Sequence, residues 1–428
     1  MDVVQCTKYK KPKYDYHNIY STIKPILFLS TLFGIGPISK NQKNNEDNKL
    51  QCTLGSKLHN LIVILVTIII SLLIIIYKFL YPKIITTNFL NMLIFFSMTI
   101  AYLILSMKKL GQKFVNITEK IAIFDEFLQL KCKRFSQYKT FILAESIILV
   151  SVIIVMLILD ILMHIKNDWI WIVNIVFLDV CICLQFVMLT QFFNFVLLIR
   201  SFLKEMNLCL YNIDGKYITE EQWKSFYDKI FLNTGNFHND ISKHNAVYKN
   251  CFRCDVQHSN SGRNLYNFHE ENIGIRNLRM LTNIIYEFCS SVNDMYGCQI
   301  LIFSVHAFFE ITMNLYGLTS GFIKDGMILL DNIFWPVLYF LILFCITGSC
   351  NAASRESYKT SEIIQKLLLN PQIREDSMTE IRHFGEQMKI QKVEFTAHDF
   401  FTINFSLLGS MVQAITTLLL IFVQFKIM

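Results

Sequence analysis

The sequence predicts an all-α membrane protein with seven transmembrane helices. Of its 428 residues, 53% are hydrophobic and only 17% are charged, whereas soluble domains carry about 25% charged residues. A helix needs about 20 apolar residues to cross the hydrocarbon core of a bilayer. Seven stretches meet this length, at 58–81, 88–107, 140–165, 169–199, 299–322, 328–350 and 400–425.

The distribution of basic residues predicts the orientation of these spans. If the N-terminus is cytosolic, the segments on the cytosolic side hold 35 of the 40 Lys and Arg residues. Short cytosolic loops are enriched in these residues. We therefore expect a multi-pass plasma-membrane protein with a cytosolic N-terminus and an extracellular C-terminus, the reverse of a G-protein-coupled receptor. Because the basic residues are scattered among the spans, we assign the net charge of +7 to contact with anionic membrane lipid and not to nucleic acid.

The spans divide the chain into segments with different expected roles. Apolar residues recur every three or four positions at Ile275, Leu278 and Leu281, which indicates helices that continue from the spans into the cytosol. The expected segments are a cytosolic N-terminal segment with an interfacial helix (1–57), helices 1–4 (58–201), a cytosolic loop with helical extensions and a flexible insert at 233–272 (202–298), helices 5 and 6 (299–350), a cytosolic helical anchor (351–398) and helix 7 (399–428).

The last span carries a stripe of polar residues. They step by four, three, four and seven positions, so they share one face of a helix. One interpretation is that the stripe hydrogen-bonds to neighbouring helices. The other is that several copies of the span surround a water-filled pore. This second interpretation is favoured by the Gln424 amide, which lies beside the Phe425 ring near the expected outer mouth. The stripe comprises Ser406, Ser410, Gln413, Thr417 and Gln424.

Polar and aromatic residues in the outer halves of the other spans predict a small-molecule site between spans two and six. A few polar groups among apolar walls are typical of such sites, and carboxylates inside a membrane are costly and usually functional. Asp160 at headgroup depth and Trp171 in an interfacial aromatic belt are the alternative interpretation. The acids favour a cationic or bitter ligand, although sugars also suit the set. The candidates are Asp160, Trp171, Asp179, Glu310, Asn314, Tyr316, Trp335 and Tyr339.

Other chemistry finds little support in the sequence. Cys251 and Cys254 lie near several histidines, but no second cysteine pair or close histidine pair completes a zinc site. We therefore expect no metal and no cofactor. Without a glycine-rich phosphate loop or a catalytic motif, we also do not expect an enzyme.

Several short motifs resemble those of insect gustatory receptors. Residues 417–425 resemble the family's C-terminal signature of Thr, Tyr, a hydrophobic run, Gln and Phe, with Leu418 in place of the Tyr. Residues 397–401 and 406–408 resemble the approach to the family's last span. The segments 291–297 and 32–37 are also similar to segments of the family.

This resemblance implies a taste receptor that is a homotetrameric ligand-gated cation channel. Its last span would line the pore, with Gln424 and Phe425 at the gate, while cytosolic helix ends would form an anchor shared between subunits. Each subunit would bind an external tastant in its own cavity. The alternatives are an odorant-receptor-like subunit that needs a co-receptor, a metabotropic receptor, which the orientation disfavours, and a transporter, whose internal repeats we do not find.

Overall fold

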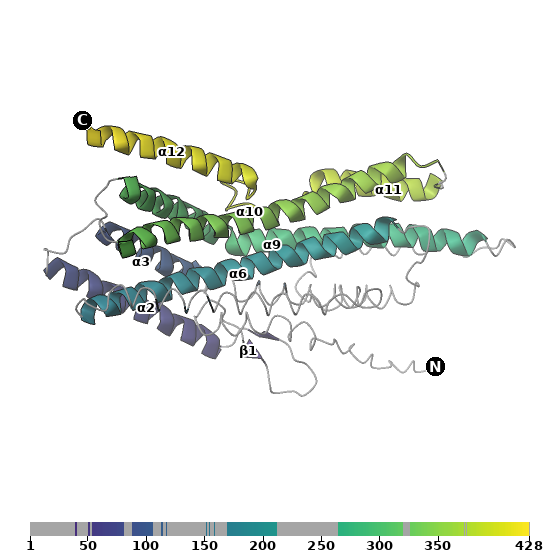
Figure 1. Cartoon of the computed structure of the whole chain (residues 1–428). Coiled ribbons are helices and arrows are strands. Elements are labelled where there is room, and N and C mark those ends of the chain that lie inside the picture. Colours follow the sequence, from purple (N-terminus) through teal and green to yellow (C-terminus); the bar gives the residue numbers. More distant parts are fainter. Residues whose placement is uncertain are drawn as a thin grey trace, which may run out of the picture.

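The computed structural model describes residues 39–40, 50–51, 54–80, 88–105, 169–211, 264–319, 326–371, 373 and 375–427, with isolated positions at 113, 117, 151, 154 and 158. Nearly all of these residues are helical, so the predicted all-α class is confirmed (Figure 1). The strands β1 (Ser39–Lys40) and β2 (Leu50–Gln51) pair antiparallel, with Ser39 opposite Gln51. The helices are α2 (Leu54–Leu80), α3 (Asn88–Leu105), α6 (Trp169–Tyr211), α9 (Asn264–Thr319), α10 (Gly326–Leu368), α11 (Glu375–Ile390) and α12 (Phe405–Ile427).

Five helices in the described part of the chain are long and apolar enough to cross a membrane, and they coincide with five expected spans. They contain the stretches Leu58–Ile76, Ile175–Leu210, Ile275–Thr319, Asn332–Leu368 and Phe405–Gln424. The expected span at 88–107 corresponds to α3, with a described apolar part at Phe96–Leu105. Of the expected span at 140–165, only Ser151, Ile154 and Ile158 are described, and all three are helical.

Three helices are much longer than a membrane is thick. α6 and α10 have 43 residues each and α9 has 56, which at 1.5 Å per residue gives about 65 and 84 Å. A bilayer core is roughly 30 Å thick, so all three helices continue beyond it, as the sequence predicts. They run unbroken through the expected segment boundaries at 201, 298 and 350.

One expectation about these extensions is wrong. α9 begins at Asn264, so residues 264–272 are helical and do not belong to a flexible insert. Once a helix is nucleated, each added residue gains a hydrogen bond at little further cost. The well-packed turns after Ile275 therefore extend α9 backwards through a polar stretch that has little apolar content of its own. The rest of that insert, like Cys251 and Cys254, lies outside the described residues.

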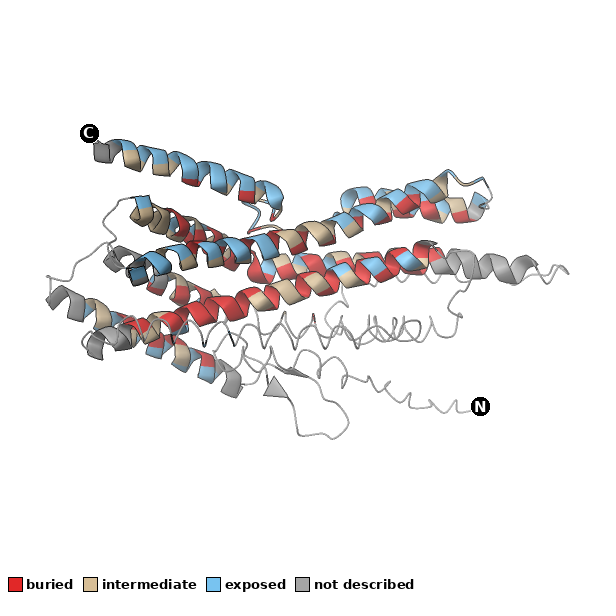
Figure 2. Cartoon of the chain, in the orientation of Figure 1, coloured by how far each residue is buried: buried red, intermediate tan, exposed pale blue. Residues whose placement is uncertain are grey.

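α6 is the centre of the core, together with α9 and α10 (Figure 2). Two-thirds of its span (67%) is buried, against 17% of the span in α12. Aromatic rings fill the contact between α6 and α9, with ring centroids 5.9 Å apart both for Phe192 and Tyr296 and for Phe195 and Phe288. α10 continues as a helix through Pro336.

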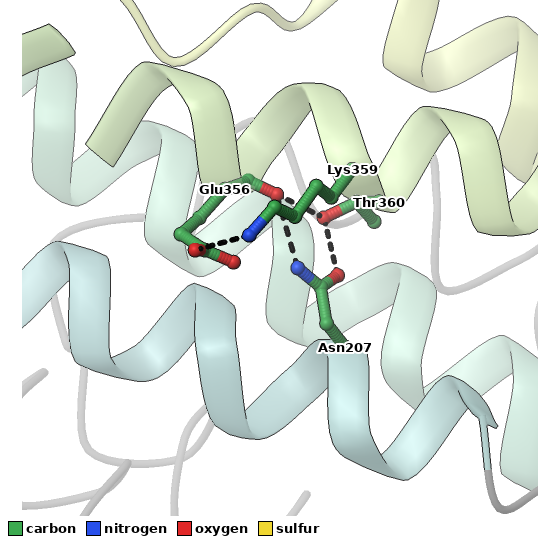
Figure 3. A network of polar contacts seen from close by, with 4 residues as sticks. All are labelled: Asn207, Glu356, Lys359 and Thr360. Atoms are coloured by element: carbon green, nitrogen blue, oxygen red, sulfur yellow. Dashed lines mark hydrogen bonds and ion pairs between the residues drawn. The ribbon is translucent and has the colours of Figure 1, made fainter. Parts of the chain in front are cut away.

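A buried polar network joins α6 to α10 (Figure 3). The Asn207 amide donates from Nδ2 to the carbonyl oxygen of Glu356 (3.0 Å) and accepts at Oδ1 from the Thr360 hydroxyl (2.7 Å). Lys359 pairs with the Glu356 carboxylate at 2.8 Å, on the more exposed side. Because an unpaired buried amide is costly, this network fixes how the two helices are aligned along their axes.

The segment between α11 and α12 is a short hairpin, which we call the 391–404 hairpin. Thr396 and Thr402 form an antiparallel bridge, and the Ile403 amide donates to the Phe395 carbonyl oxygen at 2.8 Å. Asn404 then caps α12, its Oδ1 accepting from the Ser406 amide at 3.0 Å. The last span therefore does not begin at 400 as expected, because residues 400–404 belong to the hairpin.

Candidate functional site

A polar cluster lies on one face of α9, built from residues four positions apart. His306 Nε2 is 3.7 Å from Glu310 Oε1. Asn314 Nδ2 donates to the Glu310 carboxylate at 3.2 Å and to the Glu310 carbonyl oxygen at 2.8 Å. This spacing stacks the three side chains along the helix. The carboxylate of Glu310 is thus held between an imidazole and an amide within the part of α9 expected to lie in the membrane.

α10 completes this arrangement with aromatic rings. The rings of Tyr339 and His306 form a T-shaped pair with centroids 5.4 Å apart, and the ring of Trp335 lies 6.0 Å from that of Tyr339. Tyr339 is 1% exposed, and its hydroxyl has no hydrogen-bond partner in the described part of the chain. We call His306, Glu310, Asn314, Trp335 and Tyr339 the α9–α10 cluster. It combines an acid, an amide and aromatic rings, which suits an organic ligand with a polar or cationic group.

The structure brings together four of the eight residues that the sequence suggested for a ligand: Glu310, Asn314, Trp335 and Tyr339. Tyr316 instead lies against Phe422 of α12, with ring centroids 5.3 Å apart. Asp179 is buried in α6. Trp171 lies in α6 with its side chain outside the described part, and Asp160 lies outside the described residues. The role of these residues in ligand binding stays a prediction.

Sequence reasoning did not select His306, which belongs to the α9–α10 cluster, or Gln299, which lies seven residues before it in α9. His306 is 1% exposed and lies one turn before Glu310, a spacing that was available as a signal. Gln299 exchanges hydrogen bonds with Tyr102 of α3, whose hydroxyl donates to the Gln299 carbonyl oxygen at 3.0 Å. This second pair crosses between distant segments and leaves no local pattern in the sequence.

The polar stripe of α12 faces away from the other helices that the structure describes. The opposite side of α12 packs against the core. It consists of Leu408 and Ile415, which are buried, and of Met411 and Phe422, which are half-buried. Each stripe residue from Ser410 onward follows one of these by two positions, about 200° around the helix. All five stripe residues are exposed, as the long exposed side of α12 in Figure 2 illustrates.

The hydrogen bonds of this stripe stay within α12 and its cap. The hydroxyls of Ser410 and Thr417 donate to carbonyl oxygens one turn earlier, at 3.0 and 2.9 Å. Within the described part of the chain, the stripe therefore makes no hydrogen bond to a neighbouring membrane helix. Phe425 lies in α12 with its side chain outside the described part.

Long helices with apolar spans, packed around a polar cluster, define a multi-span membrane protein. A sequence model of the family described as "7tm Chemosensory receptor" matches residues 23–428. The chain belongs to this family of seven-transmembrane chemosensory receptors.

Relatives in Drosophila melanogaster resemble part of the chain. Gustatory and pheromone receptor 32a is 28% identical over 148 residues, which are 34% of this chain and 32% of that receptor. Gustatory receptor for sugar taste 43a is 25% identical over 138 residues, 32% of each protein. The matched segment thus spans about a third of the length of these relatives.

Solved structures share the fold over nearly the whole chain. The insect olfactory receptor OR5 from Machilis hrabei superposes with a TM-score of 0.58 at 12% identity, covering 96% of this chain and 99% of that receptor. The same receptor in complex with eugenol gives a TM-score of 0.56. At this identity, the likeness establishes the arrangement of the helices and nothing about ligands.

Proposed function

We propose that this chain is a subunit of a ligand-gated cation channel that acts as a gustatory receptor. A small external tastant binds at the α9–α10 cluster, and copies of α12 line the pore. The observation that carries the proposal is the exposed polar stripe of α12, which points away from the packed face of its own helix. Several copies around a symmetry axis would turn these stripes toward one another and form a continuous polar lining.

The chemistry of the stripe suits cations that keep part of their water. Gln413, Thr417 and Gln424 offer neutral oxygens, which can replace water around a cation without binding it too tightly to leave. At the outer mouth, Gln424 and Phe425 would form the gate, because a ring of bulky side chains can exclude water when closed. The resemblance to gustatory receptors supports the same positions.

The wider setting of the proposal rests on charge and on relatives. The bias of Lys and Arg supports a plasma-membrane protein with a cytosolic N-terminus. The similar Drosophila proteins named as gustatory receptors support taste as the sense. A homotetramer is the assembly we propose, with a heteromer of related receptors as its alternative.

Cysteine substitution along α12 tests the pore directly. Gln413→Cys and Thr417→Cys channels expressed in a cell should lose current when a cationic methanethiosulfonate reagent is added outside. Val412→Cys is the matched control, since Val412 is 48% exposed but about 100° from Gln413 around the helix. Equal sensitivity at 412 and 413 would mean that the stripe does not line a pore.

Recording from the chain alone separates the homomeric channel from its alternatives. Current in cells that express only this chain supports it, and Gln424→Ala or Phe425→Ala should then change the basal current or the ion selectivity. Silence with confirmed surface expression, followed by current on adding a co-receptor, would instead assign the chain to an odorant-receptor-like heteromer. If both gate variants behave as wild type, the gate lies elsewhere.

A further inference from the structure

We infer that the 391–404 hairpin is a rigid coupling element that fixes the start of α12 on α9, with Asn293 and Gly297 as its positioning residues. This inference rests on the proposed function, because it takes α12 to be the pore helix. The position of α12 relative to α9 is a structural claim that stands apart from that role.

Asn293 binds the hairpin as a neighbouring strand would. Its Nδ2 donates to the carbonyl oxygen of Glu394 at 2.8 Å, and its Oδ1 accepts from the amide of Thr396 at 3.3 Å. One amide side chain thus satisfies a backbone acceptor and a backbone donor on the same edge of the hairpin. The Cys289 thiol, one turn earlier on α9, adds a 3.5 Å contact to the same Glu394 oxygen.

Gly297 allows the turn of the hairpin to lie directly on α9. A Cβ at this position would be 2.8 Å from the backbone nitrogen of His398 and 3.2 Å from the carbonyl oxygen of Thr396. No side chain fits there unless backbone moves. Asn293 and Gly297 of α9 therefore contact residues 394–398 of the hairpin, although the two segments are far apart in the sequence.

The turn itself has a specified conformation. His398 and Asp399 have φ values of 51° and 61°, a left-handed region that residues other than glycine, Asn, Asp and His rarely adopt. The Thr396 hydroxyl bonds the Asp399 carboxylate at 3.0 Å, which holds the turn closed. Such a conformation persists only where the surroundings determine it.

The hairpin is also anchored in the core. Its side chains alternate, so that Val393, Phe395 and Ala397 are buried while the residues between them are more exposed. The ring of Phe395 meets Phe192 of α6 edge-on, with centroids 6.1 Å apart. A segment packed against both α6 and α9 moves with them, and α12 begins at its end.

Besides the apolar face of α12, two contacts tie α12 to α9: the hairpin near its start and Tyr316 against Phe422 near its end. Between them, α9 carries Glu310 and His306 of the α9–α10 cluster. A shift of α9 on binding a ligand would reach α12 through both contacts. At the hairpin contact, Gly297 leaves room for the backbone of the turn, and the Asn293 amide makes two hydrogen bonds to it.

Hydrogen exchange of the purified full-length protein tests this coupling. We expect Asn293→Asp, which keeps the acceptor but loses the donor, and Gly297→Ala to speed exchange about tenfold in residues 394–404 and in the first turns of α12. Gly385→Ala in α11 is the matched control, because its added Cβ would lie at an ordinary 3.5 Å from Ile364. Asn293→Asp keeps the test available if Gly297→Ala does not fold.

Currents provide the second measurement, with denatonium and sucrose as the probes and surface copies counted. Lower evoked current in both variants, with wild-type current in Gly385→Ala, supports the coupling. Faster exchange confined to 394–404, with α12 unchanged, would overturn it, as would unchanged exchange throughout. If the wild type conducts with neither probe, even with a co-receptor, the proposed function is not supported, whereas exchange in α12 still decides whether the hairpin positions it.

Discussion

The hydroxyl of Thr360 illustrates how single polar groups hold the extended helices together. It is fully buried and donates to Asn207 Oδ1 at 2.7 Å. Thr360→Val keeps the shape of the side chain but removes this donor and leaves the Asn207 oxygen unpaired. We expect a loss of about 1–3 kcal/mol in the free energy of unfolding, measured by thermal unfolding in detergent.

The exposed partner in the same network provides the control for this substitution. Lys359 is 48% exposed, so its ammonium group lies near the surface, where it pairs with Glu356, whose side chain is 13% exposed. Such pairs contribute about 0–1 kcal/mol, so Lys359→Met should leave the melting temperature close to that of the wild type. If Thr360→Val and Lys359→Met melt alike, the buried network is not a stabilising element.

Glu310 is the residue through which the charge of a ligand can be tested. Glu310→Gln keeps the size of the side chain and a hydrogen-bond acceptor for Asn314 but removes the carboxylate. We expect the concentration for half-maximal current to rise about tenfold for denatonium, a cation, because charges attract strongly where the dielectric constant is low. The response to sucrose should not change.

Asp294→Asn is the control for this charge removal, since its carboxylate is 61% exposed and pairs with Lys113 well before the cluster. It should alter neither response. Equal losses for both probes in Glu310→Gln would show that Glu310 supports the structure of the cluster without contacting the ligand.

At the level of residues, the sequence predicts contacts within one helix better than contacts between helices. Glu310 and Asn314 are one turn apart, and both were selected as candidates. The contact of Tyr339 with His306 depends on how α9 and α10 are rotated about their axes, and this rotation is set by packing along their whole length. Tyr316 was grouped with Glu310 because both lie in the outer half of the same expected span. A separation of six positions, however, places the two side chains on different faces of α9.

Among the elements, α12 has a start that is marked by a side-chain cap. Asn404 Oδ1 accepts from the amide of Ser406 at 3.0 Å and from its hydroxyl at 2.6 Å. Asn404→Ala should destabilise the first turn by about 1 kcal/mol, seen as faster hydrogen exchange in residues 405–409. Asn404→Asp keeps a capping oxygen and should retain wild-type exchange. An unaffected Ala variant would mean that the hairpin, and not the cap, holds this end.

The sequence indicates the existence of the helices well and their ends less well. Long apolar runs predicted the spans, because hydrocarbon leaves a backbone few options other than a helix. The 391–404 hairpin was not predicted because it is short. Its apolar residues at every second position, Val393, Phe395 and Ala397, are nevertheless a signal of extended backbone. The start of α9 was not predicted because residues 264–272 lack a helical pattern of apolar residues. They are helical because they continue a stable helix.

In the described part of the chain, the helices form a bundle in which two spans are largely uncovered, that of α2 (22% buried) and that of α12 (17% buried). Exposed apolar residues along α2, such as Leu65, Ile69 and Leu73, suit a surface that faces lipid. α12 differs because its uncovered side is polar along the stripe, and lipid cannot satisfy polar groups. Further copies of the chain, or related receptors, are the partners that would cover it.

Mixed expression distinguishes four identical subunits from other assemblies. Gln413→Arg places a fixed positive charge on the stripe, which should exclude cations from any channel that contains it. Expressed at equal amounts with the wild type, it should leave roughly 6% of the current if four copies surround one pore and a single charge suffices to block it. Asn404→Asp, expressed in the same ratio, controls for the amount of protein.

Each other outcome identifies a different arrangement. About half of the current would remain if each channel held one copy of this chain beside a co-receptor, and about a quarter if it held two. Full current, with both proteins shown to assemble by co-purification, would place position 413 outside the conducting path. Since Gln413 is exposed and has no partner on another membrane helix in the described part of its own chain, the polar stripe would then be the surface through which subunits contact each other.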